Sequence, residues 1–218
     1  ERLTVGPLAA NCYLVGAPAG DELVIVDPGA ESDRIAAAIA ASGRRPVAIL
    51  LTHGHIDHIA HCAHLAEQYG IGVWVHREDQ PLLAGPQWPE LAEALAYRPC
   101  PEPAGWLEEG SPVRFAGLDL EVVHTPGHTP GGVCFVERAS RQALVGDTLF
   151  HRGVGRTDLP GGDGKRYSLK DAAGAATASS RWRATTSAGR GTARRPGSPK
   201  SGSRTRSSAL APATPPGE

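Results

Sequence analysis

The sequence predicts an α/β domain, and three observations support this prediction. Short apolar runs alternate with helical patterns over the first 75 residues. A second block, residues 113–145, consists of further short apolar runs separated by turn residues. Clusters of polar residues come directly after several of these runs. Strands that alternate with helices indicate a layered α/β domain, and the polar clusters fall on the loops at the strand ends.

The first half of the chain alternates strands and helices. Ile35 and Ile39 recur at helical spacing before Gly43, and a second helical pattern runs from His58 to Gly70. Ser32 or Asp33 is the expected cap of the first helix. The sequence therefore predicts helices over residues 32–42 and 58–69, and strands over residues 3–5, 11–15, 22–26, 47–51 and 73–75.

The second half is predicted to be mostly β. Residues 78–110 are rich in Pro and Trp, and a helical stretch is expected near residues 90–97. A variable segment of this kind over a sheet edge often shapes a pocket. Strands are expected at residues 113–115, 118–123, 133–136 and 143–145.

Composition excludes several classes of protein. The chain of 218 residues carries 22 Lys and Arg against 23 Asp and Glu, so its charge favours neither nucleic acid nor a membrane as partner. No apolar run is long enough to span a bilayer, and the N-terminus does not resemble a signal peptide, so we expect a cytoplasmic protein. The four cysteines are scattered, which favours reduced thiols over disulfides.

A cluster of potential metal ligands follows the predicted strand at residues 47–51. Thr52-His53-Gly54-His55-Ile56-Asp57-His58 places three histidines and an aspartate within six residues. Imidazole nitrogen and carboxylate oxygen suit zinc and similar metals. His53 and His55 can converge on one ion, while Asp57 and His58 are better placed for a second. A solvated polar loop would explain one isolated histidine, but four such residues favour a metal site.

Two later loops carry the remaining chemical groups. His124-Thr125-Pro126-Gly127-His128-Thr129-Pro130-Gly131-Gly132 follows one strand, and Gly146-Asp147-Thr148-Leu149-Phe150 follows the next. Glycine and proline hold such loops in fixed conformations. On an α/β scaffold, a metal site is built from residues at the ends of several strands, which the fold brings together.

Together, the motifs at 52–58, 125–129 and 146–150 resemble the metallo-β-lactamase fold superfamily, and its short bacterial glyoxalase II branch in particular. The resemblance covers roughly residues 3–165. It implies a four-layer αββα sandwich with the metals in a cleft at one edge of the two sheets. It also implies two zinc ions, although iron or manganese would be accepted by the same ligands. His53, His55 and His128 would hold the first ion, and Asp57 and His58 would hold the second. Asp147 would bridge the two ions. Asp57 and His58 are also the expected catalytic residues.

Two further residues have open interpretations. His124 matches no ligand position of the family, and either orients a ligand or serves loop structure. Arg156, in Gly153-Val154-Gly155-Arg156-Thr157-Asp158, corresponds to a substrate-binding cation of larger glyoxalase II enzymes. It could bind a substrate carboxylate, or pair with Asp158 or Asp163 instead.

The resemblance implies a hydrolase that cleaves a small acyl-thiol thioester such as S-D-lactoylglutathione, by a bridging water that loses its proton near neutral pH. A mono-iron persulfide dioxygenase of the same fold, using His53, His128 and Asp147, is the alternative. A third hypothesis is that the chain is an inactive, truncated member of the superfamily. The carrier thiol and the oligomeric state are left open.

The residues beyond Asp171 differ in character, because they contain no Val, Ile, Phe or Tyr. We expect residues 1–170 to form the domain and 171–218 to be a low-complexity basic tail, in place of the family's closing strand and helix. The family's Pro-Gly-His-Gly, whose histidine completes the second metal site, is missing from the sequence. The codons of Gly189–Ala193, read in a shifted frame, can encode Pro-Gly-His-Gly. In the same frame, the codons of Arg204–Ser208 can encode Asn-Pro-Phe, which follows Pro-Gly-His-Gly in the family. We therefore hypothesise a frameshift between about Lys165 and Thr177; a natural divergent tail is the competing explanation.

Overall fold

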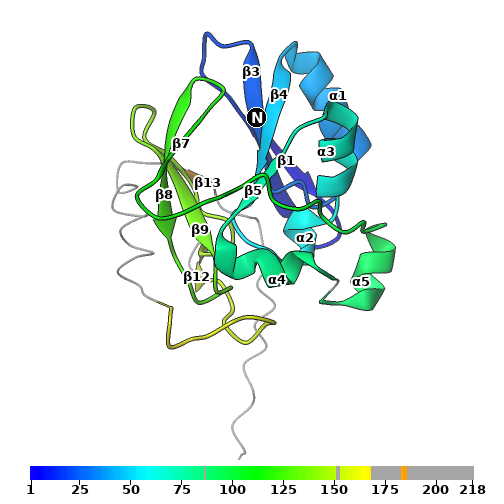
Figure 1. Ribbon diagram of the computed structural model, residues 1–218, viewed down its shortest axis with the longest axis vertical. Helices are drawn as coiled ribbons and strands as arrows, with labels where there is room; N and C mark the ends of the chain where they lie inside the picture. The colour runs from blue at the N-terminus through cyan, green and yellow to red at the C-terminus, as the bar shows by residue number, and fades with distance from the viewer. Residues whose placement is uncertain (86, 151–152, 168–182, 186–218) are drawn as a thin grey trace, which may run out of the picture.

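Two β-sheets face each other in the computed structural model, which describes residues 1–85, 87–150, 153–167 and 183–185 (Figure 1). The first sheet has the strand order β1-β2-β3-β4-β5-β6 and the second has the order β13-β10-β9-β8-β7. A separate hairpin, β11-β12, lies below the second sheet in the view of Figure 1.

The first sheet is mixed. Its first three strands pair antiparallel, and from β3 onward all pairs are parallel. Parallel neighbours need crossover connections, and α1 and α3 provide two of them. The strands are β1 (Arg2–Val5), β2 (Ala10–Val15), β3 (Glu22–Val26), β4 (Arg45–Leu50), β5 (Val73–Val75) and β6 (Gly105–Trp106).

The second sheet is antiparallel except at its edge, where β10 and β13 pair in parallel. Its strands are β7 (Pro112–Phe115), β8 (Leu118–His124), β9 (Val133–Glu137), β10 (Gln142–Leu144) and β13 (Arg183–Thr185), and the hairpin is β11 (Leu149–Phe150) with β12 (Gly153–Val154).

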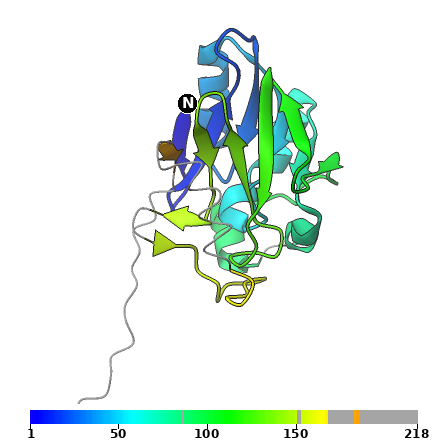
Figure 2. The same ribbon diagram turned by 90° about the vertical axis from the view of Figure 1, so that its left-hand side faces the viewer.

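Helices α1 and α3 lie on the outer face of the first sheet, and α4 and α5 lie toward the lower end of the molecule in Figure 1 (Figures 1 and 2). The helices are α1 (Ser32–Ser42), α2 (Ile56–Ile59), α3 (Cys62–Tyr69), α4 (Gln80–Leu83) and α5 (Pro89–Ala94), together with the 3-10 turn η1 (Arg77–Asp79). Among the described residues no helix covers the second sheet, so three of the four expected layers are described. None of the described helices has the length and hydrophobicity needed to cross a bilayer.

The alternation along β3 explains how the layers hold together. Ile25 points into a core shared with the helices, while Val24 and Val26 point into a second core between the sheets. All three side chains are fully buried. A strand buried on both faces has a continuous apolar run in its sequence, which is why a strand was predictable over residues 22–26.

The structure differs from the predicted helix over residues 58–69. The helix is interrupted after Ile59, because His61 is held by the preceding β3–α1 loop. The His61 amide donates to the Pro28 carbonyl at 3.0 Å, and the Ser32 amide donates to His61 Nδ1 at 3.1 Å. Tertiary hydrogen bonds thus override a helical pattern.

Other elements also differ from the sequence prediction. The N-cap of α1 is Glu31, in the left-handed conformation at φ 56°, rather than Ser32 or Asp33. The short elements β6, η1, α4 and the β11-β12 hairpin were not predicted. Within residues 171–218, expected to form a tail, the structure places the short strand β13; the rest of that segment lies outside the described residues.

Gly29 lets the β3–α1 loop press against the loop that carries the histidine cluster. A Cβ at this position would lie 1.5 Å from the Asp57 carbonyl oxygen and 3.0 Å from the His58 amide nitrogen. Both are backbone atoms, so the clash can be relieved only by moving one loop. We therefore expect Gly29→Ala to lower the free energy of unfolding by about 1–3 kcal/mol or more, as overpacking does.

Urea unfolding checks this prediction, with Gly85→Ala as the matched control, because a Cβ at Gly85 meets nothing within 4 Å. Equal unfolding midpoints for the two variants would contradict the tight contact between these loops.

Candidate metal centre

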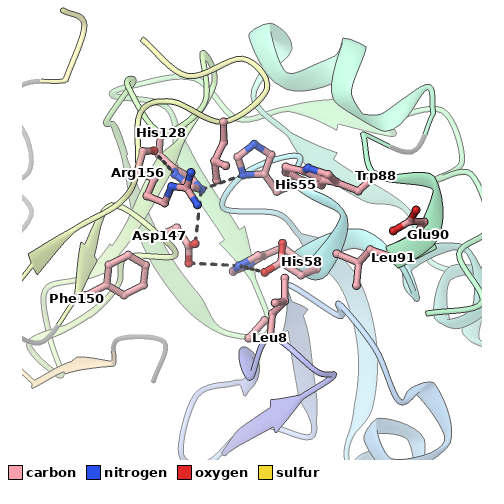
Figure 3. Close-up of a pocket in the computed structure, with 13 residues that line it drawn as sticks. Leu8, His55, His58, Trp88, Glu90, Leu91, His128, Asp147, Phe150 and Arg156 are labelled. Carbon is pink, nitrogen blue, oxygen red and sulfur yellow. Dashed lines mark hydrogen bonds and ion pairs between the residues drawn. The ribbon is translucent and has the colours of Figure 1, made fainter. Parts of the chain in front are cut away.

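Six potential ligands converge at one end of the two sheets, and Figure 3 labels four of them: His55, His58, His128 and Asp147. The loop after β4 carries His53 and His55, and the first turn of α2 carries Asp57 and His58. From the second sheet come His128, on the β8–β9 loop, and Asp147, on the β10–β11 loop. The structure therefore brings together all six residues that the sequence predicted.

The ring nitrogens of His55 and His128 face each other at a distance of 2.9 Å, from His55 Nδ1 to His128 Nε2. The opposite nitrogen of each ring lies against a backbone carbonyl. His55 Nε2 is 3.0 Å from the Pro160 oxygen, and His128 Nδ1 is 2.7 Å from the Arg156 oxygen. A carbonyl accepts only, so these two nitrogens carry the hydrogens, and the facing nitrogens of neutral rings are both lone pairs. Two lone pairs that point at each other call for a cation between them.

His53 follows the same rule through a different partner. The Thr52 hydroxyl donates to Asp27 Oδ2 at 2.6 Å, so its oxygen is left to accept from His53 Nδ1 at 3.1 Å. His53 Nε2 is then a lone pair, and it is buried without a hydrogen-bond partner among the described residues. His53, His55 and His128 can offer ligand atoms that all lie within 4.8 Å of one another. Their donor set fits a divalent transition metal.

Burial keeps His53 and His55 neutral. Desolvation, followed by the neighbouring His58 and His128, lowers the pKa of His53 well below its usual value. Desolvation and the neighbouring His128 lower the pKa of His55 to about 4. A metal binds the neutral imidazole, so at neutral pH these rings are in the protonation state that ligation requires.

His58 forms the second half of the centre with two carboxylates. Its Nδ1 lies 3.0 Å from Asp27 Oδ2, while its Nε2 lies 3.3 Å from Asp147 Oδ1 and 3.7 Å from Asp57 Oδ2. Burial disfavours the charged ring, but Asp57 and Asp147 outweigh it and raise the pKa of His58 well above its usual value. Two carboxylates around one imidazole nitrogen can bind either a proton or a metal ion. His58, Asp57 and Asp147 therefore fit a second metal ion.

Asp147 lies between the two halves. Its Oδ2 is 3.5 Å from His128 Nε2, while its Oδ1 faces His58 (Figure 3). This is the position expected of a bridging ligand. His151, which follows it in the sequence, lies outside the described residues.

Asp27 is a buried support of the centre. Besides holding the Thr52 hydroxyl and His58, it accepts from the Thr52 amide at 2.7 Å. It thereby orients His53 through Thr52 and His58 directly. Carboxylates that hold the second nitrogen of a ligand histidine in this way fix the ring and its tautomer. The sequence showed Asp27 only as the end of a strand.

Asp79 is a second support, and sequence reasoning missed it. Its side chain is fully buried and accepts from the Gly54 amide at 2.8 Å, the Thr129 hydroxyl at 2.7 Å and the Gly131 amide at 2.5 Å. Gly54 lies between the ligands His53 and His55, and Thr129 follows the ligand His128. One carboxylate thus ties together the two loops that bear the three histidines. No short motif marks it, because its partners are 25 to 52 residues away.

An open cavity of about 470 Å³ lies over the centre. Side chains of His55, Asp57, His58, His128 and Asp147 line one part of it. The apolar part of the wall is formed by Leu8, Ala10, Trp88, Leu91, Phe150 and Leu159. Trp88 and Leu91 come from the Pro- and Trp-rich segment that was expected to shape a pocket.

Arg156 also lines this cavity, and its guanidinium pairs with Asp158 through two hydrogen bonds of 2.9 Å and 2.7 Å. Both side chains are about two-thirds exposed. Of the two partners considered from the sequence, the structure selects Asp158, since Asp163 accepts from the Lys165 amide instead. His124 lies away from the centre, with its Nε2 3.0 Å from the Pro130 carbonyl.

Comparisons with known proteins agree with this geometry. The family model described as the metallo-beta-lactamase superfamily matches residues 5–182. The hydroxyacylglutathione hydrolase GloC of Haemophilus influenzae is 34% identical over 168 residues, which cover 75% of this chain and 77% of that protein. A probable metallo-hydrolase of Bacillus subtilis, YqgX, is 36% identical over 164 residues, covering 75% and 77%.

Among solved structures, TTHA1623 in a di-iron-bound form is 42% identical with a TM-score of 0.68, covering 76% of this chain and 81% of that one. That neighbour binds two metal ions on the same fold. The chain described here belongs to the metallo-β-lactamase superfamily.

Proposed function

We propose that this protein hydrolyses small acyl thioesters, with S-D-lactoylglutathione as the model substrate, as glyoxalase II enzymes do. The observation that carries the proposal is the convergence of three imidazole lone pairs and two carboxylates, most of them in the wall of the open cavity. The similarity to a hydroxyacylglutathione hydrolase supports a thioester as the substrate class.

His53, His55 and His128 would hold one divalent ion, Asp57 and His58 a second, and Asp147 would contact both. Such a pair of ions supplies a water that ionises near neutral pH and a Lewis acid for the carbonyl oxygen. Zinc is the metal we expect, and the di-iron form of TTHA1623 shows that a relative accepts iron.

The chain's own residues orient the reaction. In the hydrolysis, water oxygen bonds to the acyl carbon, the carbon–sulfur bond breaks, and the thiolate leaves and takes up a proton. Asp57 lines the cavity and its carboxylate faces His58, so it is placed to hold the attacking water and receive its proton. The proposed reaction needs no serine or cysteine nucleophile. Cys62 and Cys134 are fully buried, and burial raises the pKa of each thiol.

The experiment is a thiol-release assay on the purified chain loaded with Zn²⁺ or with Fe²⁺. S-D-lactoylglutathione should release glutathione, and Asp57→Asn should reduce the rate by about 10²–10⁴-fold, the usual contribution of a positioned acid–base group. Metal-loaded protein that releases no thiol, both as written and with the reading frame restored, would contradict the proposal.

A persulfide dioxygenase using His53, His128 and Asp147 is the second candidate, and the same assay separates the two. Oxygen consumption with glutathione persulfide, without thioester cleavage, would favour it.

Arg156 provides a test of substrate recognition. We propose that its guanidinium exchanges Asp158 for a substrate carboxylate, since an exposed ion pair is easily exchanged. Arg156→Ala should raise KM for the glutathione thioester several-fold with kcat unchanged, and Asp158→Ala, which frees the guanidinium, should lower KM or leave it as it is. Parallel changes of KM in the two variants would show that the pair serves only the loop.

A further inference from the structure

His76 and His124 form a stacked pair outside the centre described above. His76 lies between β5 and η1, and His124 is the last residue of β8, so the pair joins the two sheets. The ring centroids are 4.2 Å apart and the ring planes are inclined by 16°. Glu78, in η1, completes a group of three ligand atoms that all lie within 4.8 Å of one another.

The hydrogen bonds of the pair leave nitrogen lone pairs available. His124 Nε2 is 3.0 Å from the Pro130 carbonyl, so it carries the hydrogen, and Nδ1 of the neutral ring is a lone pair. His76 Nδ1 accepts from the Glu78 amide at 3.3 Å, which is long for such a bond and therefore easily given up. Burial and the neighbouring His124 lower the pKa of His76, which keeps the ring neutral and able to ligate.

A second stacked pair in the same chain differs from this one in its hydrogen bonds and its neighbours. The rings of His61 and His64 are 4.8 Å apart and inclined by 24°. Both nitrogens of His61 are used by the backbone, one accepting from the Ser32 amide and the other donating to the Leu95 carbonyl. Among the described residues no carboxylate joins this pair in a group of potential ligands.

We propose that His76, Glu78 and His124 form a further binding site for a divalent transition metal of the zinc class. Neighbouring ligands of a tetrahedral zinc ion are about 3.4 Å apart for bonds of about 2.0–2.1 Å. Glu78 is exposed and free to rotate, so its carboxylate can move toward the two more buried rings until the ligand atoms reach that spacing.

Arg166 is the group that competes with an ion at this site. Its Nη1 lies 2.7 Å from Glu78 Oε2, and both side chains are more than 40% exposed. A carboxylate has two oxygens, so Glu78 can keep Arg166 on one and bind an ion with the other. Removing Arg166 should then tighten metal binding, because one positive charge less faces the ion.

An ion here would act on the structure rather than on the reaction. His124 directly precedes the loop that carries His128, while His76 and Glu78 flank the turn that leads to Asp79. Binding would clamp β8 to η1 beside the Asp79 contact between the two ligand loops. A ligand that binds only the folded state raises stability.

Zinc binding at controlled free Zn²⁺, followed by elemental analysis of the purified full chain, tests the proposal. The variants are Glu78→Gln, which keeps the size of an exposed side chain, His124→Ala, and His64→Ala as the control from the other stacked pair. The wild type and His64→Ala should bind one more zinc per chain than the other two, and Arg166→Ala should bind this ion at lower free Zn²⁺.

A second readout is the rise in melting temperature on adding Zn²⁺ to protein whose main centre is already loaded. Glu78→Gln should lose this rise while retaining its thioester hydrolysis. Equal zinc stoichiometry in wild type, Glu78→Gln and His124→Ala would overturn the proposal. Loss of the additional zinc ion in His64→Ala would overturn it as well.

Discussion

Replacing Asp147 with asparagine should remove most of the activity and weaken metal binding at both halves of the centre. Asp147 is the carboxylate that faces both His58 and His128, at 3.3 Å and 3.5 Å. The amide of asparagine is neutral and places an N–H group where an oxygen ligand is needed. We expect thioester hydrolysis to fall at least 10²-fold, comparable to the loss of a preorganised stabilising group.

The measurement is kcat together with metal content per chain. Asp119→Asn is the control, because Asp119 is an exposed partner of Arg114, far along β8 from the centre. An Asp147→Asn protein with full metal content and unchanged kcat would show that this carboxylate does not bridge the two halves.

Asp79→Asn should loosen the centre without removing any ligand. The buried carboxylate accepts three hydrogen bonds, and an amide can accept only through its one oxygen while its NH₂ faces N–H donors. We expect metal affinity to fall about 10–100-fold, as it does when a group that orients ligands is lost. Unsatisfied buried groups should also cost about 1–3 kcal/mol of folding free energy.

Metal titration and urea unfolding of the same protein separate these two effects. Excess metal should restore kcat in Asp79→Asn, because the ligands themselves are intact, whereas it should not do so in Asp147→Asn. Activity that stays low at saturating metal would mean that Asp79 has another role than holding the two loops.

The ligands were predictable from the sequence because each lies in a short motif directly after a strand. His53, His55, Asp57 and His58 fall in one heptapeptide, and two more loops supply His128 and Asp147. Strand ends meet at one edge of a sheet, so local patterns were sufficient to assemble the site. The central strands were predictable for another local reason: a strand that is buried on both faces has a continuous apolar run in its sequence.

The remaining features depend on contacts between distant segments. Asp79 holds loops that lie 25 to 52 residues away, and nothing in its own neighbourhood signals this. The interruption between α2 and α3 depends on hydrogen bonds from His61 to the β3–α1 loop. His124 had no evident partner in the sequence, because His76, against which it stacks, is 48 residues earlier. Propensity and periodicity cannot reveal such contacts.

The origin of residues 171–218 is a separate proposal. We propose that they are translated out of frame, so that the chain as written lacks the last histidine of the second metal site. Restoring the frame with a single-base change between about Lys165 and Thr177 should return Pro-Gly-His-Gly and raise the metal content. A gene sequence in which no such change recovers this motif would contradict the frameshift.

The most direct test of the whole account is metal content by elemental analysis of the purified chain, as written and with the frame restored. With Glu78→Gln in the background to exclude the His76–His124 site, the account predicts that the chain as written retains a transition metal that His55→Ala or His128→Ala abolishes, and that the restored chain holds two ions. Protein that is folded but binds no transition metal in either form would show that the converging imidazoles and carboxylates are not a metal centre.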